Sequence, residues 1–206
     1  MELENINKIL NKRKECPMGI NESFSVLLPL IDIDGELHLI YEIRAEHLET
    51  QPGEISFPGG MVEWGETHEE AAVRETEEEL NISRKNIEII GKTDFLITPF
   101  NIAIYPFVGV IKNVDLKDIR FSKCEVDDIF TVPLKFFLSE GPLEHFLYME
   151  PKPEREFPYH MVQRGKAYDW RIGKYPVLFY EYNNYIIWGI TARITRNFID
   201  ILKYSF

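Results

Sequence analysis

The sequence predicts one α/β (α+β) domain in which a mixed β-sheet is layered with helices. The chain has 206 residues, of which 45% are hydrophobic and 13% aromatic, so it can bury a sizeable core without disulfides. Segments with strand-like runs of apolar residues are interleaved with segments whose apolar residues recur at helical spacing. No internal repeat or low-complexity linker divides the chain. These observations favour a single domain over residues 1–206.

The N-terminal part predicts a helix followed by a hairpin. Apolar residues at helical spacing predict a helix over residues 3–15, namely Leu3, Ile6, Ile9 and Leu10. We expect this helix to dock on the core, although its apolar face also suits the interface of a homodimer. Strand-like runs over residues 24–31 and 37–43 flank the turn pair Asp34 and Gly35, which predicts a β-hairpin.

The rest of the chain alternates between strand and helix signals. Thr67 followed by Glu70 has the form of a capping box and predicts the start of a helix over residues 67–80. A proline-rich stretch before residue 177 has no regular pattern and is expected to be irregular. The other expected elements are strands over 87–97, 102–111, 125–132, 177–180 and 185–187, and helices over 134–138, with Pro133 at its first position, and 191–202.

The composition excludes several classes of protein. The net charge of −11 argues against a general nucleic-acid binder, because duplex affinity comes mostly from basic side chains that neutralise phosphates. No apolar run approaches the roughly 20 residues that a membrane helix needs. Cys16 and Cys124 lie outside any C-x-x-C pair, which argues against a disulfide framework or a cysteine zinc site. We therefore expect a cytoplasmic protein without nucleic-acid or membrane partners.

The negative charge is concentrated in one segment. Between Glu63 and Glu79 there are eight glutamates and a single base, Arg74, which gives a local net charge of −7. Glu75, Glu78 and Glu79 stand at i, i+3 and i+4, and so share one helix face near its C-terminus. Mutual repulsion and the helix dipole both oppose this placement, whereas a divalent cation would favour it. The alternative is a solvated acidic face, but the spacing predicts a phosphate-handling metal site.

Two neighbouring features can complete such a site. Arg74, four residues before Glu78, can hold a carboxylate by a bidentate contact. Ahead of the helix, residues 53–60 end in the pair Gly59 and Gly60, where the backbone can approach a ligand or expose a carbonyl. Taken alone, the glycine pair fits a tight turn equally well.

The combined spacing resembles a known family motif. From Gly60, the sequence continues with five residues, Glu66, seven residues, Arg74 and Glu75, two residues, then Glu78 and Glu79. Over residues 60–82 this resembles the Nudix box of hydrolases that act on nucleoside diphosphates linked to another group. The resemblance implies a Nudix-type α/β/α sandwich and hydrolysis with Mg²⁺ or Mn²⁺. Two positions depart from the family pattern: Thr76 replaces a bulky aliphatic residue, and Asn81 replaces a glycine.

A second resemblance concerns the substrate. The segment before the box resembles the motif of coenzyme A diphosphatases at Arg44, Ala45, Gly53 and residues 57–60. Segments over residues 125–134 and 187–193 are similar to later parts of that subgroup. The chain departs from it at residues 40–42, Ile-Tyr-Glu in place of Leu-Leu-Thr, and at Glu49 in place of Arg. The resemblance implies hydrolysis of coenzyme A or its thioesters to 3′,5′-ADP and (acyl-)phosphopantetheine.

The resemblance also implies residue roles. Glu78 and Glu79 would bind the metal together with the carbonyl of Gly59, and Glu75 would be a further ligand or the general base. Arg74 would orient these carboxylates, and Glu66 would be structural or lie outside the ligand sphere. The remaining candidates are Glu125 or Asp128 as an additional acid, Arg44, Gly53 and Gly60 for substrate binding, and Arg155, Arg164, Lys166 and Arg171 for a 3′-phosphate.

Two other functions stay open. The first is the same chemistry on ADP-ribose or another nucleoside diphosphate derivative, which the departure at Glu49 allows. The second is a noncatalytic nucleotide-binding Nudix module. Such a module is expected to lack carboxylates of the box, whereas this chain has the full set.

Overall fold

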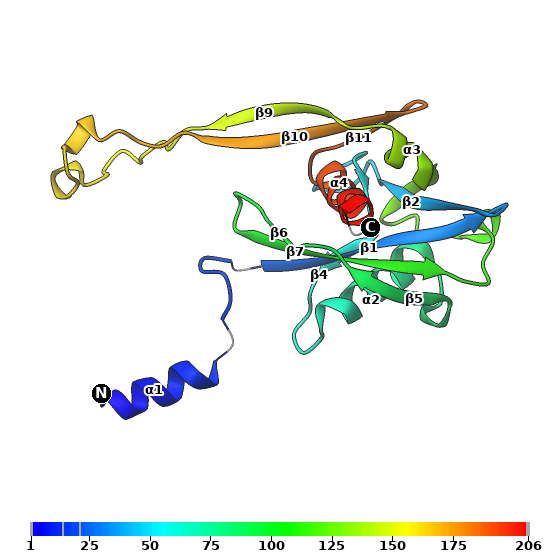
Figure 1. Ribbon diagram of the computed structural model, residues 1–206, viewed down its shortest axis with the longest axis horizontal. Helices are drawn as coiled ribbons and strands as arrows, with labels where there is room; N and C mark the ends of the chain where they lie inside the picture. The colour runs from blue at the N-terminus through cyan, green and yellow to red at the C-terminus, as the bar shows by residue number, and fades with distance from the viewer. Residues whose placement is uncertain (1, 14, 21, 205–206) are drawn as a thin grey trace.

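The computed structural model describes residues 2–13, 15–20 and 22–204, and its centre is a mixed sheet (Figure 1). Its strand order is β3-β2-β1-β7-β5, with β4 paired to β1, β6 to β7 and β8 to β2. β1 and β7 run parallel, and the other pairs of described strands are antiparallel. The strands are β1 (Glu22–Ile33), β2 (Glu36–Arg44), β3 (Ile55–Ser56), β4 (Gly59–Met61), β5 (Ile87–Lys92), β6 (Leu96–Ile97), β7 (Ile102–Ile111) and β8 (Val126–Pro133).

Helices cover both faces of this sheet. Helix α2 (His68–Leu80) lies on one face, while α4 (Gly189–Tyr204) and the short α3 (Leu134–Ser139) lie on the other (Figure 1). Neighbouring residues of β2 point to opposite faces of the sheet. Ile40 belongs to the core cluster beneath α2, and Tyr41 belongs to the cluster beneath α4. The expected α/β/α sandwich is confirmed. Two 3₁₀ turns, η1 (Arg84–Asn86) and η2 (Leu116–Asp118), lie in the connections.

The β1–β2 hairpin forms as its turn residues predict. Asp34 and Gly35 have φ angles of 54° and 82°, the left-handed conformation that two-residue hairpin loops require. The carboxylate of Asp32 accepts the Gly35 N–H at 2.9 Å, and Ile33 lies opposite Glu36. This tight turn fixes the register of two strands that both contribute to the core.

Helix α2 is bounded by the signals seen in the sequence. The Thr67 hydroxyl accepts the Glu70 N–H, and the Glu70 carboxylate accepts the Thr67 N–H, which confirms the capping box. Asn81 ends the helix with φ 52° and ψ 33°, the left-handed conformation that asparagine tolerates. Thr76 is fully buried, and its hydroxyl donates to the carbonyl of Ala72 at 2.7 Å, so the polar group is satisfied within the helix.

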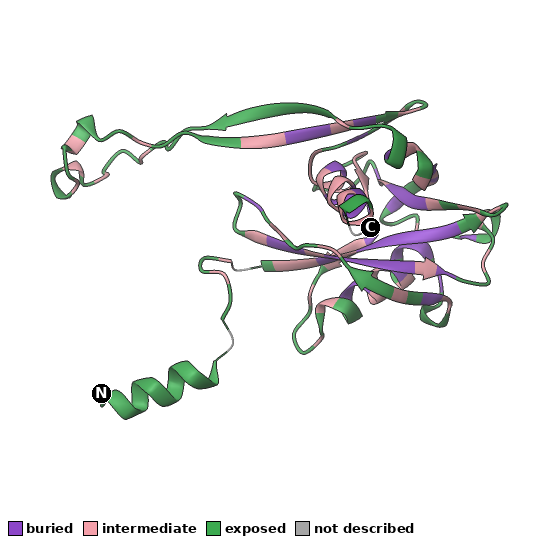
Figure 2. Ribbon diagram, in the orientation of Figure 1, coloured by how far each residue is buried: buried purple, intermediate pink, exposed green. Residues whose placement is uncertain are grey.

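Helix α1 (Leu3–Lys12) ends earlier than expected and does not pack on the core. Arg13 is already extended, and Lys14 lies outside the described residues. No residue of α1 is buried, and the helix projects from the domain (Figures 1 and 2). The expectation that it docks on the core of its own chain is therefore wrong.

Two smaller expectations also need correction. The strand expected over residues 87–97 is interrupted, because β5 ends at Lys92 and Asp94 hydrogen-bonds with Asn197 of α4. Pro133 is the last residue of β8, and α3 begins one residue later.

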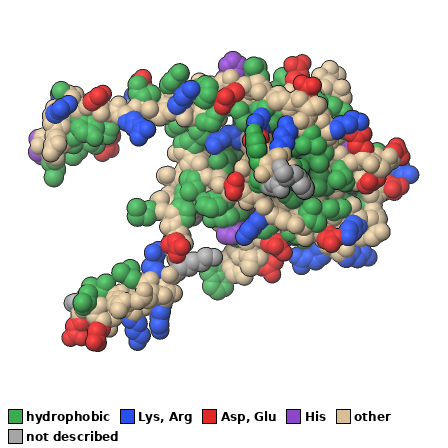
Figure 3. Space-filling view, viewed as in Figure 1, with side chains coloured by type: hydrophobic (Ala, Val, Ile, Leu, Met, Phe, Trp, Pro, Cys, Tyr) green, Lys and Arg blue, Asp and Glu red, His purple; other side chains and the backbone are tan. Residues whose placement is uncertain are grey.

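A second sheet forms an arm. Strand β9 (Leu143–Met149) pairs with β10 (Gly173–Tyr182), which also pairs with β11 (Tyr185–Trp188). The β9–β10 ribbon extends away from the domain, and all residues of β9 are exposed (Figures 1 and 2). Its tip contains the turns η3 (Tyr159–Met161) and η4 (Gly165–Ala167). Hydrophobic side chains lie along both the arm and α1 (Figure 3).

The stretch before residue 177 is thus not irregular throughout, because part of it forms β9 and the start of β10. In the part of the chain that the structure describes, no helix is long and apolar enough to cross a membrane.

Candidate functional site

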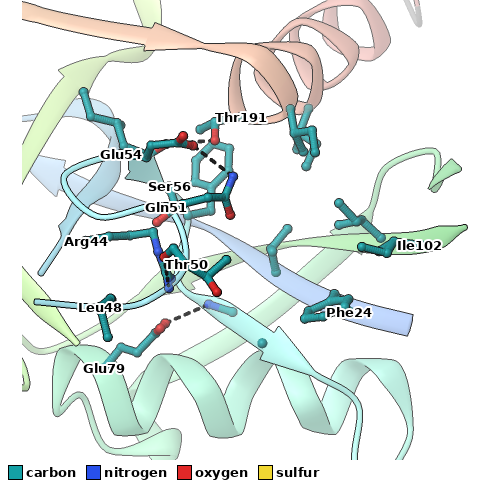
Figure 4. Close-up of a pocket in the computed structure, with 18 of the residues that line it drawn as sticks. Phe24, Arg44, Leu48, Thr50, Gln51, Glu54, Ser56, Glu79, Ile102 and Thr191 are labelled. Atoms are coloured by element: carbon teal, nitrogen blue, oxygen red, sulfur yellow. Dashed lines mark hydrogen bonds between the residues drawn. The ribbon is translucent and has the colours of Figure 1, made fainter. Parts of the chain in front are cut away.

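A cavity of about 620 Å³ opens where the C-terminal end of α2 meets the loop after β2 and the start of α4. Its two ends differ in character. Figure 4 shows Arg44, Thr50 and Glu79 grouped at one end, and Phe24 and Ile102 at the other. A charged ligand group and an apolar one can therefore occupy the same cavity.

Glu79 reaches this cavity from α2 and is 3% exposed. Its Oε2 accepts the Gly59 N–H at 2.8 Å (Figure 4). Burial raises the pKa of Glu79 above the ordinary value, and the charge of Glu42 raises it further. Position 59 requires glycine because β4 lies close to β1: a Cβ there would lie 2.3 Å from the carbonyl oxygen of Ser25.

Arg74 connects the carboxylates of the acidic run. Its Nε and Nη2 donate to the two oxygens of Glu66 at 3.2 and 2.8 Å, so the bidentate contact goes to Glu66. Its Nη1 donates to Glu75 at 2.8 Å and to Glu78 at 3.2 Å. Arg74 therefore orients Glu75 and Glu78, and Glu66 anchors Arg74 in turn.

Glu75 lies against the glycine loop. A Cβ on Gly60 would lie 2.3 Å from Oε1 of Glu75, so only glycine leaves room for this carboxylate in its present position. Partial burial raises the pKa of Glu75, while the hydrogen bond from Arg74 acts in the opposite direction. The position of the Glu75 carboxylate therefore depends on the glycine pair as well as on helix α2.

The two candidates for an additional acid differ in position. Glu125 lines the cavity, and its negative charge contributes to the raised pKa of both Glu75 and Glu79. Asp128 does not line the cavity, and its Oδ1 accepts the Ile129 N–H at 2.9 Å. The position of Glu125 suits the role, and that of Asp128 does not.

The substrate-binding candidates separate in the same way. Arg44 lines the cavity and donates from Nη2 to the Thr50 carbonyl at 3.3 Å, while its buried Nε has no hydrogen-bond partner among the described residues. Gly60 also lines the cavity, but Gly53 does not. Gly53 has φ 68° and donates its N–H to the Arg44 carbonyl at 3.0 Å, so it shapes the loop that carries Arg44.

The four basic candidates for a 3′-phosphate lie elsewhere. They belong to residues 150–172, which lie at the far end of the arm (Figure 1), and none of them lines the cavity.

Glu42 was not among the site residues that the sequence predicts. It is 1% exposed, and its Oε1 accepts the Ser56 hydroxyl at 2.8 Å. Burial raises the pKa of Glu42, and the charges of Glu125 and Glu75 add to this. The available signal was an acidic residue inside an apolar strand, at a position where the coenzyme A motif has threonine.

The site fits a hard divalent cation by the type of its donors. Carboxylate and carbonyl oxygens are the ligands that Mg²⁺ and Mn²⁺ prefer. As the side chains stand, no three His, Cys, Asp or Glu residues in the described part of the chain converge around a single point. Arg74 contributes to the separation of these carboxylates, because it holds Glu75 and Glu78 by direct contacts. Metal binding therefore requires rotation of side chains.

Comparisons with known proteins agree with this geometry. A family model for the NUDIX domain matches residues 23–147. Nudix hydrolase 3 from Caenorhabditis elegans is 35% identical over 130 residues, which cover 61% of this chain and 53% of the relative. Peroxisomal coenzyme A diphosphatase NUDT7 from Mus musculus is 27% identical over 176 residues, or 84% of this chain and 67% of the relative. The chain thus spans about half the length of the first relative and about two thirds of the second.

Among solved structures, a binary complex of the C. elegans Ap4A hydrolase matches with a TM-score of 0.47 and 22% identity, over 54% of this chain and 80% of that protein. The family model, by contrast, covers more than half of the chain and includes the glycine loop, α2 and the strands that position them. The chain therefore belongs to the Nudix family.

Proposed function

We propose that this chain is a metal-dependent diphosphatase that hydrolyses coenzyme A or its thioesters to 3′,5′-ADP and (acyl-)phosphopantetheine. The observation that carries the proposal is the position of the Nudix-box carboxylate Glu79, beside Glu125, in the lining of a cavity whose other end is apolar. Membership of the Nudix family supports hydrolysis of a nucleoside diphosphate linkage. The relative named as a coenzyme A diphosphatase supports the choice of substrate.

Each residue of the box has a separate role in the proposed hydrolysis. Bound Mg²⁺ or Mn²⁺ would neutralise phosphate oxygens and lower the pKa of the attacking water. Glu78 and Glu79 would hold the cation together with the Gly59 carbonyl, and Glu75 would be a further ligand or the general base that accepts the proton of that water. Arg74 keeps Glu75 and Glu78 oriented through its two contacts from Nη1.

Arg44 is suited to the phosphates of the substrate. Its buried Nε has no partner among the described residues, so it offers a donor at the polar end of the cavity. Glu125 adds a further carboxylate at the same end.

The apolar end of the cavity favours coenzyme A over ADP-ribose. Phe24, Ile102 and Ile194 contribute to its wall, and an apolar wall suits the pantetheine chain better than a second ribose. Glu49, which departs from the coenzyme A motif, is exposed and does not line the cavity. Its negative charge therefore does not face the bound substrate directly.

The proposal also includes a cytoplasmic location and a homodimer. Cys16 and Cys124 are both exposed free thiols, which suits the reducing cytoplasm. A homodimer stays a prediction, supported by the exposed apolar residues of α1.

The test is a substrate panel with product identification. The purified chain is incubated with Mg²⁺ or Mn²⁺ and coenzyme A, acetyl-coenzyme A, ADP-ribose, diadenosine polyphosphates or NADH, and the products are weighed by mass spectrometry. We expect 3′,5′-ADP and phosphopantetheine to dominate, and Glu78→Gln to lower turnover by about 10- to 100-fold or more. Preferred release of AMP from ADP-ribose would reject coenzyme A as the substrate and keep the chemistry.

A further inference from the structure

Glu42 is a buried carboxylate that has no ion pair within the described residues. It is 1% exposed and lies in β2 beside the fully buried Ile40 and Tyr41. Its Oε1 accepts the Ser56 hydroxyl, while its Oε2 has no hydrogen-bond partner among the residues that the structure describes. Burying an ionised carboxylate without a partner is costly, and a cation bound at this second oxygen would offset that cost.

The strand register places Glu42 on the same face as the box carboxylates. Residues two apart in a strand share a face, and Ile40 packs in the cluster beneath α2. Glu42 therefore emerges from the sheet toward α2, the helix that carries Glu79. Its partner across the strand pair is Ser56, which lines the cavity. Apart from burial, the negative charge of Glu42 is the largest influence that raises the pKa of Glu79.

Glu42 also differs from the other acids in what holds it. Arg74 contacts Glu75 and Glu78 directly, and these two carboxylates must rotate before they can meet a cation. Among the described residues, Ser56 is the hydrogen-bond partner of one oxygen of Glu42, and the other oxygen has none. The charge of Arg44 lowers the pKa of Glu42, but the two residues form no ion pair among the described residues.

We propose that Glu42 is a further ligand of the divalent cation in this site, offering Oε2 from the sheet side, opposite the carboxylates of α2. The inference rests on the metal site of the proposed function and adds a residue that the Nudix box does not contain. Ser56 is the positioning residue, because its hydrogen bond holds Oε1, while Oε2 has no hydrogen-bond partner among the described residues. The ligand is a hard cation such as Mg²⁺ or Mn²⁺, which binds carboxylate oxygens in preference to nitrogen or sulfur.

The test measures metal binding in the absence of substrate. The full chain is stripped with a chelator and titrated with Mn²⁺, with free Mn²⁺ followed by electron paramagnetic resonance. We expect Glu42→Gln to weaken Mn²⁺ binding by about 10- to 100-fold. The melting temperature of the metal-free variant should stay the same or rise, because an amide of equal shape replaces the buried acid. A smaller loss of affinity is expected for Ser56→Ala.

The matched control is Glu69→Gln. Glu69 is exposed in the first turn of α2, so the substitution removes one negative charge from the same acidic run at a distance from the cavity. We expect its Mn²⁺ affinity to stay within about twofold of the unmodified chain, because exposed charges are screened by solvent and salt. Equal losses in the two variants would mean that only net charge matters, which would overturn the role of Glu42.

The remaining outcomes separate this inference from the proposed function. If the unmodified chain binds Mn²⁺ and Glu42→Gln binds it equally well, Glu42 is not a ligand and the proposed function stands. If the unmodified chain binds no Mn²⁺, both fail. Should Glu42→Gln not fold, Glu42→Asp keeps the charge but withdraws the oxygens by one methylene. Its expected result is weaker Mn²⁺ binding, and unchanged binding would overturn the inference.

Discussion

Replacing Gly60 with alanine tests whether the position of Glu75 matters for catalysis. The added Cβ would lie 2.3 Å from Oε1 and 2.4 Å from Cδ of Glu75, whereas ordinary contacts begin near 3.4 Å. The carboxylate must therefore move by about 1 Å, and displacement of that size in an active site can cost about 100-fold in rate. The clashing atoms belong to the end of a flexible side chain, and Gly60 has no left-handed φ, so the fold should survive.

The assay compares metal-dependent kcat and melting temperature for Gly60→Ala, with Gly91→Ala as the control. Gly91 lies in β5 and has no left-handed φ, and a Cβ added there would meet no atom within 4 Å, so its substitution should change neither quantity. We expect kcat of Gly60→Ala to fall by about 100-fold with a nearly unchanged melting temperature. A folded Gly60→Ala protein that keeps at least half of the original kcat would refute the role given to Glu75.

Three further predictions follow from the same contacts. Arg74→Lys keeps the charge but loses the bidentate contact with Glu66, so metal-dependent turnover should fall by about 10- to 100-fold, measured with saturating Mg²⁺. Thr67→Ala removes the cap of α2 and should lower the free energy of unfolding in urea by about 1 kcal/mol. In chelator, the folded-state pKa values of Glu42 and Glu79 are raised above 4.5, so the folded chain binds more protons than the unfolded chain above that pH. Stability of the metal-free protein should therefore fall as the pH rises from about 5 to about 8, and a urea midpoint that rises instead would contradict the raised pKa values.

The sequence predicts those parts of the fold whose signals are local. The β1–β2 turn needs left-handed residues, and the pair Asp34 and Gly35 provides them. The start of α2 is set by Thr67, and its end by Asn81. Strand β9 shows the opposite case, since all of its residues are exposed and its pairing partner β10 lies beyond residue 172. Its segment LEHFLYM lacks the alternation of apolar and polar residues that marks a half-buried strand.

The site is predictable to the extent that it lies on one helix. The spacing of Glu75, Glu78 and Glu79 follows from helical geometry alone, and so does the reach of Arg74 to Glu78. Glu42 could not be placed, because its burial depends on the register of β2 against β3 and on the packing of α2 over that face. The local sequence marks Glu42 only as an acidic residue inside an apolar strand, and this does not show which groups it faces.

The parallel pairing of β1 with β7 has a consequence for folding during synthesis. Glu22 lies opposite Ile102, so the centre of the sheet cannot close until 80 further residues have been made. Translation proceeds at about 5–20 residues per second, so several seconds pass before β7 is available to pair with β1. The face that α4 covers waits longer still, because Phe198 and Ile199 are among the last core residues translated. Chains that stop before α4 would expose this apolar face, and aggregation rather than partial activity is their expected fate.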